Sequence, residues 1–296
     1  MADERTFDDR DGFIWLDGKL VPWRDANVHV LTHALHYASS VFEGQRAYGG
    51  TIFKLHEHSE RLHNSARLLG FEIPWSVDEI DAACNEVLKA NEMTDAYMRP
   101  VAWRGSEKMG VSPKGTKPHL AIAAWAWGKY FDPAKAEKGI RLDIAPWRRP
   151  APYTAPVHSK AAGLYMIATL SKQHADNRGY DDALMFDWRG QVAEATGANA
   201  FFVRDGELHT PTPDCFLDGI TRRTVIDLAR RRGVSVIERP IWPEELESFE
   251  QMFLTGSAAE VTFVGSAGPW NFEVGDFSRQ LAKDYDDLVN GRLPNR

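Results

Sequence analysis

The sequence has little that would mark a secreted, membrane-spanning or metal-binding protein. Among 296 residues there are only two cysteines, Cys84 and Cys215, and they form no CxxC pair. We therefore expect buried free thiols rather than a disulfide, and no metal site. The longest apolar run, residues 120–127, is far too short to cross a bilayer, and residues 1–12 contain no apolar signal region. These absences favour a cytoplasmic location.

An excess of positive charge is also missing. The net charge is −7, and the basic clusters are short: Arg148-Arg149, Arg222-Arg223 and residues 230–232. Because an acidic chain repels a nucleic-acid backbone, we expect neither nucleic acid nor a membrane as a partner. By contrast, 43% apolar and 11% aromatic residues are enough for a large core, and 296 residues favour two domains.

The first half of the chain predicts a mixed α and β domain. Helical apolar spacing from residue 55 to 69 stops at Gly70, and Ser76 with Glu79 forms a capping-box pattern at the start of a second helix. Alternating apolar residues and glycine turns predict strands at residues 13–23 (a hairpin), 41–55 (a second hairpin), 97–105 and 120–127.

A polar segment at 129–139, interrupted by Pro133, is interpreted as the connection between two domains. It separates a smaller N-terminal domain, 1–128, from a larger C-terminal domain, 140–296. Strands in hairpins alternate there with isolated helices rather than forming βα units, which argues against a doubly wound sheet. The expected strands are 140–147, 183–187, 191–194, 199–204, 207–210 and 234–241, and the expected helices follow Lys160 and occupy 221–232 and 277–290.

The stretch from Ser159 to Val203 contains the residues with the most distinctive chemistry. Lys160 stands among small residues, Tyr165 lies in the helical segment that follows, and Glu194 precedes a polar, glycine-containing bend. A lysine that bonds to a cofactor and an acid that faces a ring nitrogen would suit a pyridoxal phosphate enzyme. Taken alone, neither residue is distinctive, because most lysines and glutamates are solvated.

Two further segments could bind an anion. Residues 218–221 directly precede an amphipathic helix, whose N-terminus would present free amides. The local sequence by itself favours Thr221 as an ordinary N-cap. Residues 255–259 combine small side chains with two hydroxyls, which would let an anion approach the backbone. Arg61, on a predicted helix, would by itself be interpreted as a solvated arginine.

Six segments in consistent order resemble one enzyme family. They are LTHALHYASSVFEGQRAY (31–48), AYMRPVAWRG (96–105), AAWAWGKY (123–130), the stretch 159–203, PTPDCFLDGITRRTV (211–225) and LTGSAAEV (254–261). Together they resemble the fold-type IV aminotransferases that use pyridoxal 5′-phosphate, and among them the branched-chain amino-acid aminotransferases. The resemblance implies a mixed α/β (α+β) fold of two domains, with mixed or antiparallel sheets, flanking helices and a C-terminal cofactor-binding domain.

The resemblance also implies roles at the cofactor. Lys160 would bond to it and move a proton at the substrate α-carbon, Glu194 would pair with its ring nitrogen, and Tyr165 would hydrogen-bond its phenolic oxygen. The phosphate would be surrounded by Arg61, Ile220, Thr221 and Ser257.

At the substrate, Tyr97 with the amides of Ser257 and Ala258 would bind the α-carboxylate. An apolar side-chain pocket would be formed by Phe42, Gly44, Trp127 and Tyr130, with Tyr37 and Val111 from a partner subunit, so that at least a homodimer is implied.

Arg99 would allow two unlike substrates to share one pocket. A branched aliphatic chain and a glutamate γ-carboxylate need opposite surroundings, and an arginine at the edge of apolar walls, helped by the Tyr37 hydroxyl, would meet the carboxylate when it is present. The implied reaction transfers the amino group of L-leucine, L-isoleucine or L-valine to 2-oxoglutarate by a ping-pong mechanism. Two departures from the family pattern, Ala198 and Leu164, would tune the site rather than abolish its chemistry.

Other functions share parts of these patterns. A D-amino-acid or (R)-amine transaminase, or an aminodeoxychorismate lyase, would retain Lys160 and Glu194 on the same fold, but the YxRP and WGxY patterns favour branched-chain substrates. A binding protein that keeps the cofactor without catalysis is a further alternative. A metal-dependent hydrolase using His56, His58 and His63 is disfavoured, because the segment lacks the i, i+4 histidine pair of a zincin helix.

Overall fold

The computed structural model describes residues 5–128 and 130–293, and the chain divides into two compact units. Unit 1 comprises Met1–Gly128 and Ser159–Leu164, and unit 2 comprises Lys129–His158 and Tyr165–Arg296. The expected domains, 1–128 and 140–296, differ from this division in two segments, because residues 129–139, interpreted as a connection, belong to unit 2 and Ser159–Leu164 belongs to unit 1. Ser159–Leu164 groups with unit 1, because its backbone is hydrogen-bonded to a helix and a strand of that unit.

Unit 1 is built on one sheet whose strand order is β2-β1-β7-β6-β4-β5, with β3 also paired to β6, and all its pairings are antiparallel. Its strands are β1 (Phe13–Leu16), β2 (Lys19–Pro22), β3 (Ser40–Phe42), β4 (Gln45–Tyr48), β5 (Thr51–Ile52), β6 (Ala96–Arg104) and β7 (Pro118–Trp125). Its helices are η1 (Trp23–Asp25), α1 (His33–Tyr37), α2 (Leu55–Leu68), α3 (Val77–Ala90) and η2 (Ala162–Leu164).

Local signals account for the ends of these elements. Asp17 and Gly18 both have positive φ, 47° and 98°, as a tight hairpin turn between β1 and β2 requires. Ser76 and Glu79 form the predicted capping box at the start of α3. Gly70, at φ 73°, follows the end of α2. The predicted hairpins, helices and strands of the first half are therefore confirmed.

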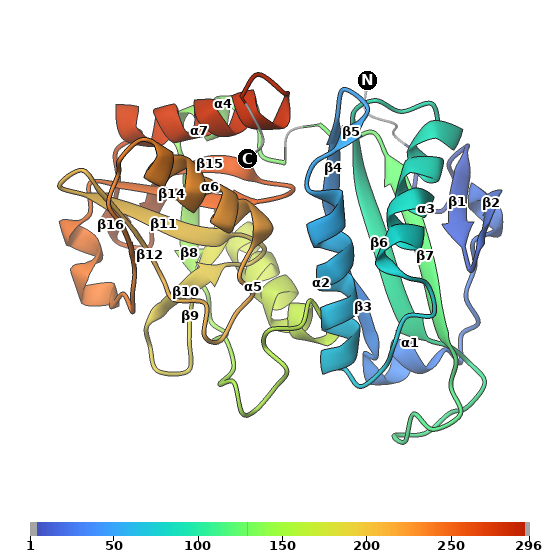
Figure 1. Ribbon diagram of the computed structural model, residues 1–296. Helices are drawn as coiled ribbons and strands as arrows, with labels where there is room; N and C mark the ends of the chain where they lie inside the picture. Colours follow the sequence, from blue (N-terminus) through green and yellow to red (C-terminus); the bar gives the residue numbers. More distant parts are fainter. Residues whose placement is uncertain (1–4, 129, 294–296) are drawn as a thin grey trace. The chain divides into compact units, whose positions relative to one another are not determined.

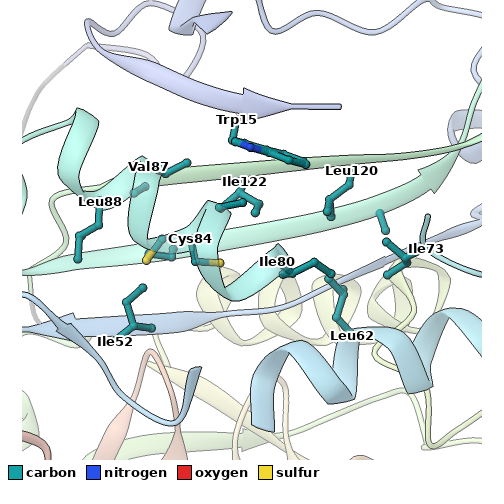
Figure 2. Packing of buried hydrophobic residues seen from close by; sticks show 14 of the residues in the cluster. Trp15, Ile52, Leu62, Ile73, Ile80, Cys84, Val87, Leu88, Leu120 and Ile122 are labelled. Carbon is teal, nitrogen blue, oxygen red and sulfur yellow. The ribbon is translucent and has the colours of Figure 1, made fainter. Parts of the chain in front are cut away.

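The core of unit 1 lies between α2, α3 and the sheet (Figure 1). Figure 2 shows Leu62 of α2 and Ile80 of α3 pointing toward Leu120 and Ile122 of β7. These four side chains are at most 1% exposed. Each fully buried leucine or isoleucine contributes about 1.5–3 kcal/mol through burial, so the helices are firmly docked on the sheet.

Unit 2 contains a larger mixed sheet. Its order is β10-β9-β8-β15-β14-β11-β12-β13, with β16 paired to β15, and an additional pairing of β10 with β11 closes the first six strands into a ring. The β8–β9, β8–β15 and β12–β13 pairs are parallel, and the other pairs are antiparallel. The strands are β8 (Ile140–Ile144), β9 (Asp182–Phe186), β10 (Val192–Ala195), β11 (Asn199–Arg204), β12 (Glu207–Thr210), β13 (Val236–Glu238), β14 (Gln251–Gly256), β15 (Glu260–Ala267) and β16 (Trp270–Asn271).

Helices accompany this sheet, as expected for a mixed fold (Figure 1). They are α4 (Pro133–Lys138), α5 (Tyr165–Asn177), α6 (Ile220–Arg231), η3 (Pro243–Ser248) and α7 (Asp276–Val289). The segment interpreted as a connection thus contains a helix. Pro133 occupies the first turn of α4, where its missing N–H costs nothing, and the Asp132 side chain caps the amides of Ala134 and Lys135.

No helix among the described residues is both long enough and apolar enough to cross a membrane.

Candidate active site

Lys160 is held in unit 1 by its backbone. Its amide donates to Ser65 Oγ on α2 at 3.0 Å, and its carbonyl accepts from the Phe42 amide at 3.1 Å. Ser159 Oγ donates to the Ser65 carbonyl at 2.9 Å, and Ser65 is fully buried. The lysine side chain extends beside Phe42, so that Nζ lies 5.0 Å from the centre of the ring. The predicted catalytic lysine is therefore anchored by one helix and one strand.

A cluster of aromatic side chains adjoins this lysine. Tyr97 contacts the Trp127 ring, with 5.4 Å between centroids, and the Arg99 guanidinium lies 4.7 Å from the Phe42 centroid. Gly44 completes the cluster, because a Cβ there would lie 2.1 Å from the Tyr97 hydroxyl oxygen. Only glycine leaves room for that hydroxyl, so five of the predicted substrate residues are brought together in unit 1.

Arg99 has a side-chain donor that could form a further hydrogen bond. It donates through an Nη2–H to the Tyr97 hydroxyl at 3.0 Å, which confirms that the two alternate residues of β6 share one face. Its Nε is buried and has no hydrogen-bond partner among the described residues. A buried guanidinium donor without an acceptor is costly, and a bound carboxylate would satisfy it.

Arg61 belongs to a buried charged triad. Its Nε and one Nη donate to the two carboxylate oxygens of Glu43 at 2.7 and 2.8 Å, and His58 Nδ1 donates to the same carboxylate at 2.7 Å. Burial alone would raise the pKa of Glu43, but the Arg61 and His58 charges and hydrogen bonds outweigh it and hold the pKa well below its usual range. Burial lowers the pKa of His58. Glu43 thus lies ionised between Arg61 and His58, and Arg61 is not the solvated arginine of the alternative interpretation.

Tyr37 and Val111 lie on exposed segments of unit 1, with 42% and 82% exposure. His33 links their segments: its ring contacts Tyr37, with 4.8 Å between centroids, and its Nε2 donates to the Gly110 carbonyl at 3.0 Å. Further large apolar side chains of these two segments are exposed, namely Val28, Val30, Leu31, Leu35 and Met109. Contiguous exposed apolar side chains on this scale commonly mark an interaction surface.

Glu194 occupies β10 of unit 2 and is held on both oxygens. Arg149 Nε lies 3.4 Å from its Oε1, and Asn199 Nδ2 donates to its Oε2 at 3.2 Å. Arg149 and Asn199 are buried, at 6% and 5% exposure, whereas Glu194 itself is partly exposed. Directly beside Asn199 in the sheet, Thr255 Oγ1 is buried without a hydrogen-bond partner among the described residues.

The N-terminus of α6 carries Ile220 and Thr221 in its first turn. Its N-cap is Gly219, with no side-chain cap, so the interpretation of Thr221 as an N-cap is wrong. Nearby, the fully buried Arg222 is fixed by Asp218 at 2.9 Å and by the Pro211 carbonyl at 3.1 Å. An uncapped first turn keeps its amides available to an anion.

The turn between β14 and β15 carries Ser257 and Ala258, both half-buried. Ala258 lines a cleft of about 230 Å³ together with Tyr130, Phe131 and Val261. The cleft brings two of the predicted substrate residues, Tyr130 and Ala258, to one place in unit 2.

The remaining predicted residues lie next to these. Tyr165 is the first residue of α5, directly after Leu164 at the end of η2. Ala198 lies in the bend between β10 and β11, close to Gly256. A Cβ added at Gly256 would lie 3.6 Å from the Cβ of Ala198. A bulkier side chain at 198 would therefore press on the turn that carries Ser257.

The three histidines of the metal alternative lie in different environments. His58 bonds to Glu43, whereas His56 Nδ1 bonds to Asp81 at 2.9 Å. His63 is a third, separate case, because its Nε2 is buried without a hydrogen-bond partner among the described residues.

Several structurally important residues escaped sequence reasoning: Ser65, Glu43, His58, Arg149 and Asn199. Glu43 carried one usable signal, a charged residue between Phe42 and Gly44 in a region predicted to form a strand. Ser65 and Arg149 have partners distant in sequence, since Lys160 lies 95 positions after Ser65 and Glu194 lies 45 positions after Arg149.

With this geometry in place, comparisons with known proteins identify the family. Residues 40–267 match the family model described as amino-transferase class IV. A "Probable branched-chain-amino-acid aminotransferase" of Rickettsia felis is 44% identical over 280 residues, covering 93% of this chain and 95% of that protein. Two structures of a T.th. branched-chain amino acid aminotransferase, with pyridoxamine 5′-phosphate and with N-(5′-phosphopyridoxyl)-L-glutamate, are each 38% identical, cover 96% of both chains and have TM-scores of 0.92 and 0.91.

These matches show that the chain is a class IV aminotransferase. Within that family, it belongs to the branched-chain-amino-acid aminotransferases. The expected fold-type IV architecture is confirmed.

Proposed function

We propose that this chain transfers the amino group of L-leucine, L-isoleucine or L-valine to 2-oxoglutarate, yielding branched 2-keto acids and L-glutamate, with pyridoxal 5′-phosphate as cofactor. The substrate assignment rests on the surroundings of Arg99. Its guanidinium lies against the rings of Phe42 and Tyr97, and its Nε has no hydrogen-bond partner among the described residues. Such a site offers apolar contact to an aliphatic chain and a charged partner to a γ-carboxylate.

The residues present fit the cofactor. A phosphate needs hydrogen-bond donors, and the uncapped α6 N-terminus, Ser257 and Arg61 would supply them. A protonated pyridine nitrogen needs a carboxylate, and Glu194 is held by Arg149 and Asn199. When bound, the cofactor supplies an electron sink for charge that develops at the substrate α-carbon.

The chain's own groups would then share the work. The Lys160 amine would bond to the cofactor and carry a proton to and from the substrate α-carbon, since its backbone is fixed by Ser65 and Phe42. Glu194 would accept the hydrogen bond of the ring N–H, and Tyr165 would donate to the phenolic oxygen. Ile220 and Thr221 would offer backbone amides to the phosphate.

Substrate recognition would combine two anchors. Tyr97 and the amides of Ser257 and Ala258 would bind the α-carboxylate that all these substrates share. The side chain would lie among Phe42, Gly44, Trp127 and Tyr130, with Arg99 reserved for the γ-carboxylate. The N-(5′-phosphopyridoxyl)-L-glutamate complex of the T.th. relative is consistent with glutamate as one substrate.

We further propose a homodimer in the cytoplasm. The exposed apolar side chains around Tyr37 and Val111 would be covered by a second subunit, to whose pocket these two residues would contribute. The two free, buried cysteines suit a reducing compartment. Sedimentation analysis tests the assembly: a dimer is expected, and Val111→Glu should shift it toward monomer.

The decisive test of the activity is the visible absorption spectrum of the purified protein before and after L-leucine is added without a keto acid. A band from lysine-bound cofactor that bleaches with L-leucine, and returns with 2-oxoglutarate, is expected. Lys160→Ala is the control, because it removes the bond to the cofactor. A band that responds only to D-amino acids or (R)-amines would replace the substrate assignment by the alternative one.

A further inference from the structure

We propose that Asn199 is a positioning residue that fixes Glu194 relative to the N-terminus of α6, and so sets the spacing between the two ends of the cofactor site. The proposal rests on the function proposed above, because it assumes that Glu194 faces the cofactor ring and that α6 faces its phosphate. Nothing in the sequence pattern distinguished Asn199 from other strand residues.

The first connection is to the acid. Asn199 on β11 is the direct cross-strand neighbour of Glu194 on β10, so their side chains share one face of the ring of strands. Asn199 Nδ2 donates to Glu194 Oε2 at 3.2 Å. A neutral donor stabilises the ionised carboxylate without adding the second positive charge that would compete with a ring N–H.

The second connection is to the helix. The same Nδ2 carries a second hydrogen and donates it to the Leu217 carbonyl at 3.0 Å, three residues before α6 begins. Asn199 Oδ1 lies against Gly219, the N-cap of α6, so closely that a Cβ at 219 would come within 2.2 Å of it. One amide therefore touches both the acid and the segment that sets the start of the helix.

The two connections are rigid because Asn199 is 5% exposed and sits in a strand paired on both sides. Arg149 lies beside the other oxygen of Glu194, so removing Asn199 would leave that ion pair in place but take away the hydrogen bond that orients Oε2. Removing Asn199 should therefore disturb the geometry of the site rather than its charge. It should weaken the binding of a ligand that must contact both Glu194 and the N-terminus of α6.

The test compares Asn199→Ala and Asn199→Asp with wild type in three measurements: the affinity of apoprotein for pyridoxal 5′-phosphate, its affinity for inorganic phosphate, and the pH midpoint of the visible band of the bound cofactor. Asn199→Ala should lower cofactor affinity about ten- to hundredfold, as expected for a lost hydrogen bond to a charged group. Phosphate alone does not reach Glu194, so its affinity should fall less than about threefold. The pH midpoint of the band should move, since the carboxylate beside the ring has changed.

Asn91→Ala is the matched control. Asn91 is a half-buried asparagine of unit 1 whose amide also bridges two backbone carbonyls, those of Phe13 and Val87. Its loss should lower the thermal midpoint of the apoprotein yet leave both affinities and the pH midpoint unchanged.

Asn199→Asp decides the matter if Asn199→Ala does not fold, because aspartate has the same shape, cannot donate and repels Glu194. It should lose at least as much cofactor affinity. The proposal would be overturned if the Asn199 variants bound the cofactor within about twofold of the wild-type affinity and showed a pH midpoint within about 0.2 units of the wild-type value. These limits are roughly the precision of such titrations. The visible band of the wild-type protein, recorded with L-leucine, distinguishes a failure of the proposed function from a failure of this inference. If the wild type shows no cofactor band that bleaches with L-leucine, the proposed function fails. If the wild type shows that band and the Asn199 variants match it, only the inference about Asn199 fails.

Discussion

Glu43 and Arg61 form a two-pronged ion pair in which the carboxylate is completely buried and the guanidinium only slightly exposed. The contacts to the carboxylate use Nε and one Nη of the guanidinium. Because a guanidinium is planar and its N–H donors form a rigid fork, two such bonds fix the direction of the whole group.

Removing that carboxylate should be costly. Breaking a buried ion pair on one side typically costs about 3–5 kcal/mol, so Glu43→Ala should lower the free energy of unfolding by about that amount, and cofactor affinity should fall with it. Urea unfolding of the apoprotein measures the first effect. Glu57→Ala is the control, since Glu57 is exposed beside Lys54 and should change stability by less than about 0.5 kcal/mol. Equal effects of the two substitutions would contradict the structural role of Glu43.

Ser65 should matter to Lys160 through the backbone alone. Ser65→Ala removes the acceptor of the Lys160 amide, and we expect turnover to fall about tenfold while the cofactor still binds. Single-turnover bleaching of the visible band by L-leucine measures it. Ser59→Ala, on the same helix, removes a buried hydroxyl that has no partner among the described residues and should be silent. A Ser65→Ala enzyme with normal rates would show that the anchor is dispensable.

Arg99 should separate the two half-reactions. Arg99→Ala should reduce kcat/KM for L-glutamate about ten- to hundredfold, because a charge-assisted hydrogen bond is lost, and reduce that for L-leucine only slightly. Arg99→Lys keeps the charge and should restore part of the activity with glutamate. Equal losses with both substrates would refute the role of Arg99 as the γ-carboxylate partner.

The buried carboxyl group of Asp182 should make the free energy of unfolding depend on pH. Burial raises its pKa, and the hydrogen bonds from Thr196 Oγ1 and the Ala183 amide only partly offset this. A carboxyl group whose pKa is raised in the folded state contributes to stability at pH values below its pKa in the unfolded chain, near 3.8. That contribution is lost as the pH rises through the pKa in the folded state.

Asp182→Asn, which does not titrate and keeps the Oδ1 acceptor, should thus be more stable than wild type at pH 8, and the difference should shrink toward pH 4. Urea unfolding at both pH values is the measurement. A difference that stays constant with pH would mean that Asp182 is ionised at little cost in the fold.

The two thiols should be inert in the folded protein. Burial, followed by the neighbouring Asp187 and Asp214 charges, raises the pKa of Cys215 to about 12, and burial raises the pKa of Cys84 as well. At pH 8 only about one Cys215 in 10⁴ would be thiolate, so iodoacetamide should neither label nor inactivate the native enzyme. The urea-unfolded chain, which exposes both thiols, is the control. Rapid labelling of the native protein would contradict the burial.

The sequence predicted what is decided locally. The Asp17-Gly18 turn, the Ser76 capping box and the strands around Arg99 depend on neighbouring residues, and the structure confirms them. The interpretation of Thr221 as an N-cap failed because Gly219, two residues earlier, adopts the extended cap conformation and leaves Thr221 inside the helix. Capping preference alone does not fix where a helix begins.

The supporting residues could not be predicted because their partners are set by tertiary pairing. Glu194 meets Arg149, 45 residues earlier, only once β8, β9 and β10 are assembled. Ser65 is an unremarkable helix serine until the segment after residue 158 is laid beside it. The family resemblance named the residues expected to touch ligands, but the residues that hold them required the fold.

The grouping of Ser159–Leu164 with unit 1 has an evolutionary consequence. The gene region for unit 1 is interrupted by coding sequence for unit 2, so a fission after Gly128 would part Lys160 from the serine and strand that seat it. A polypeptide made from the first piece would keep the seat and lack the lysine. Recombination at this boundary replaces either Lys160 or the Ser65 and Phe42 that anchor it, so the anchor survives such an exchange only where the donor chain supplies matching residues.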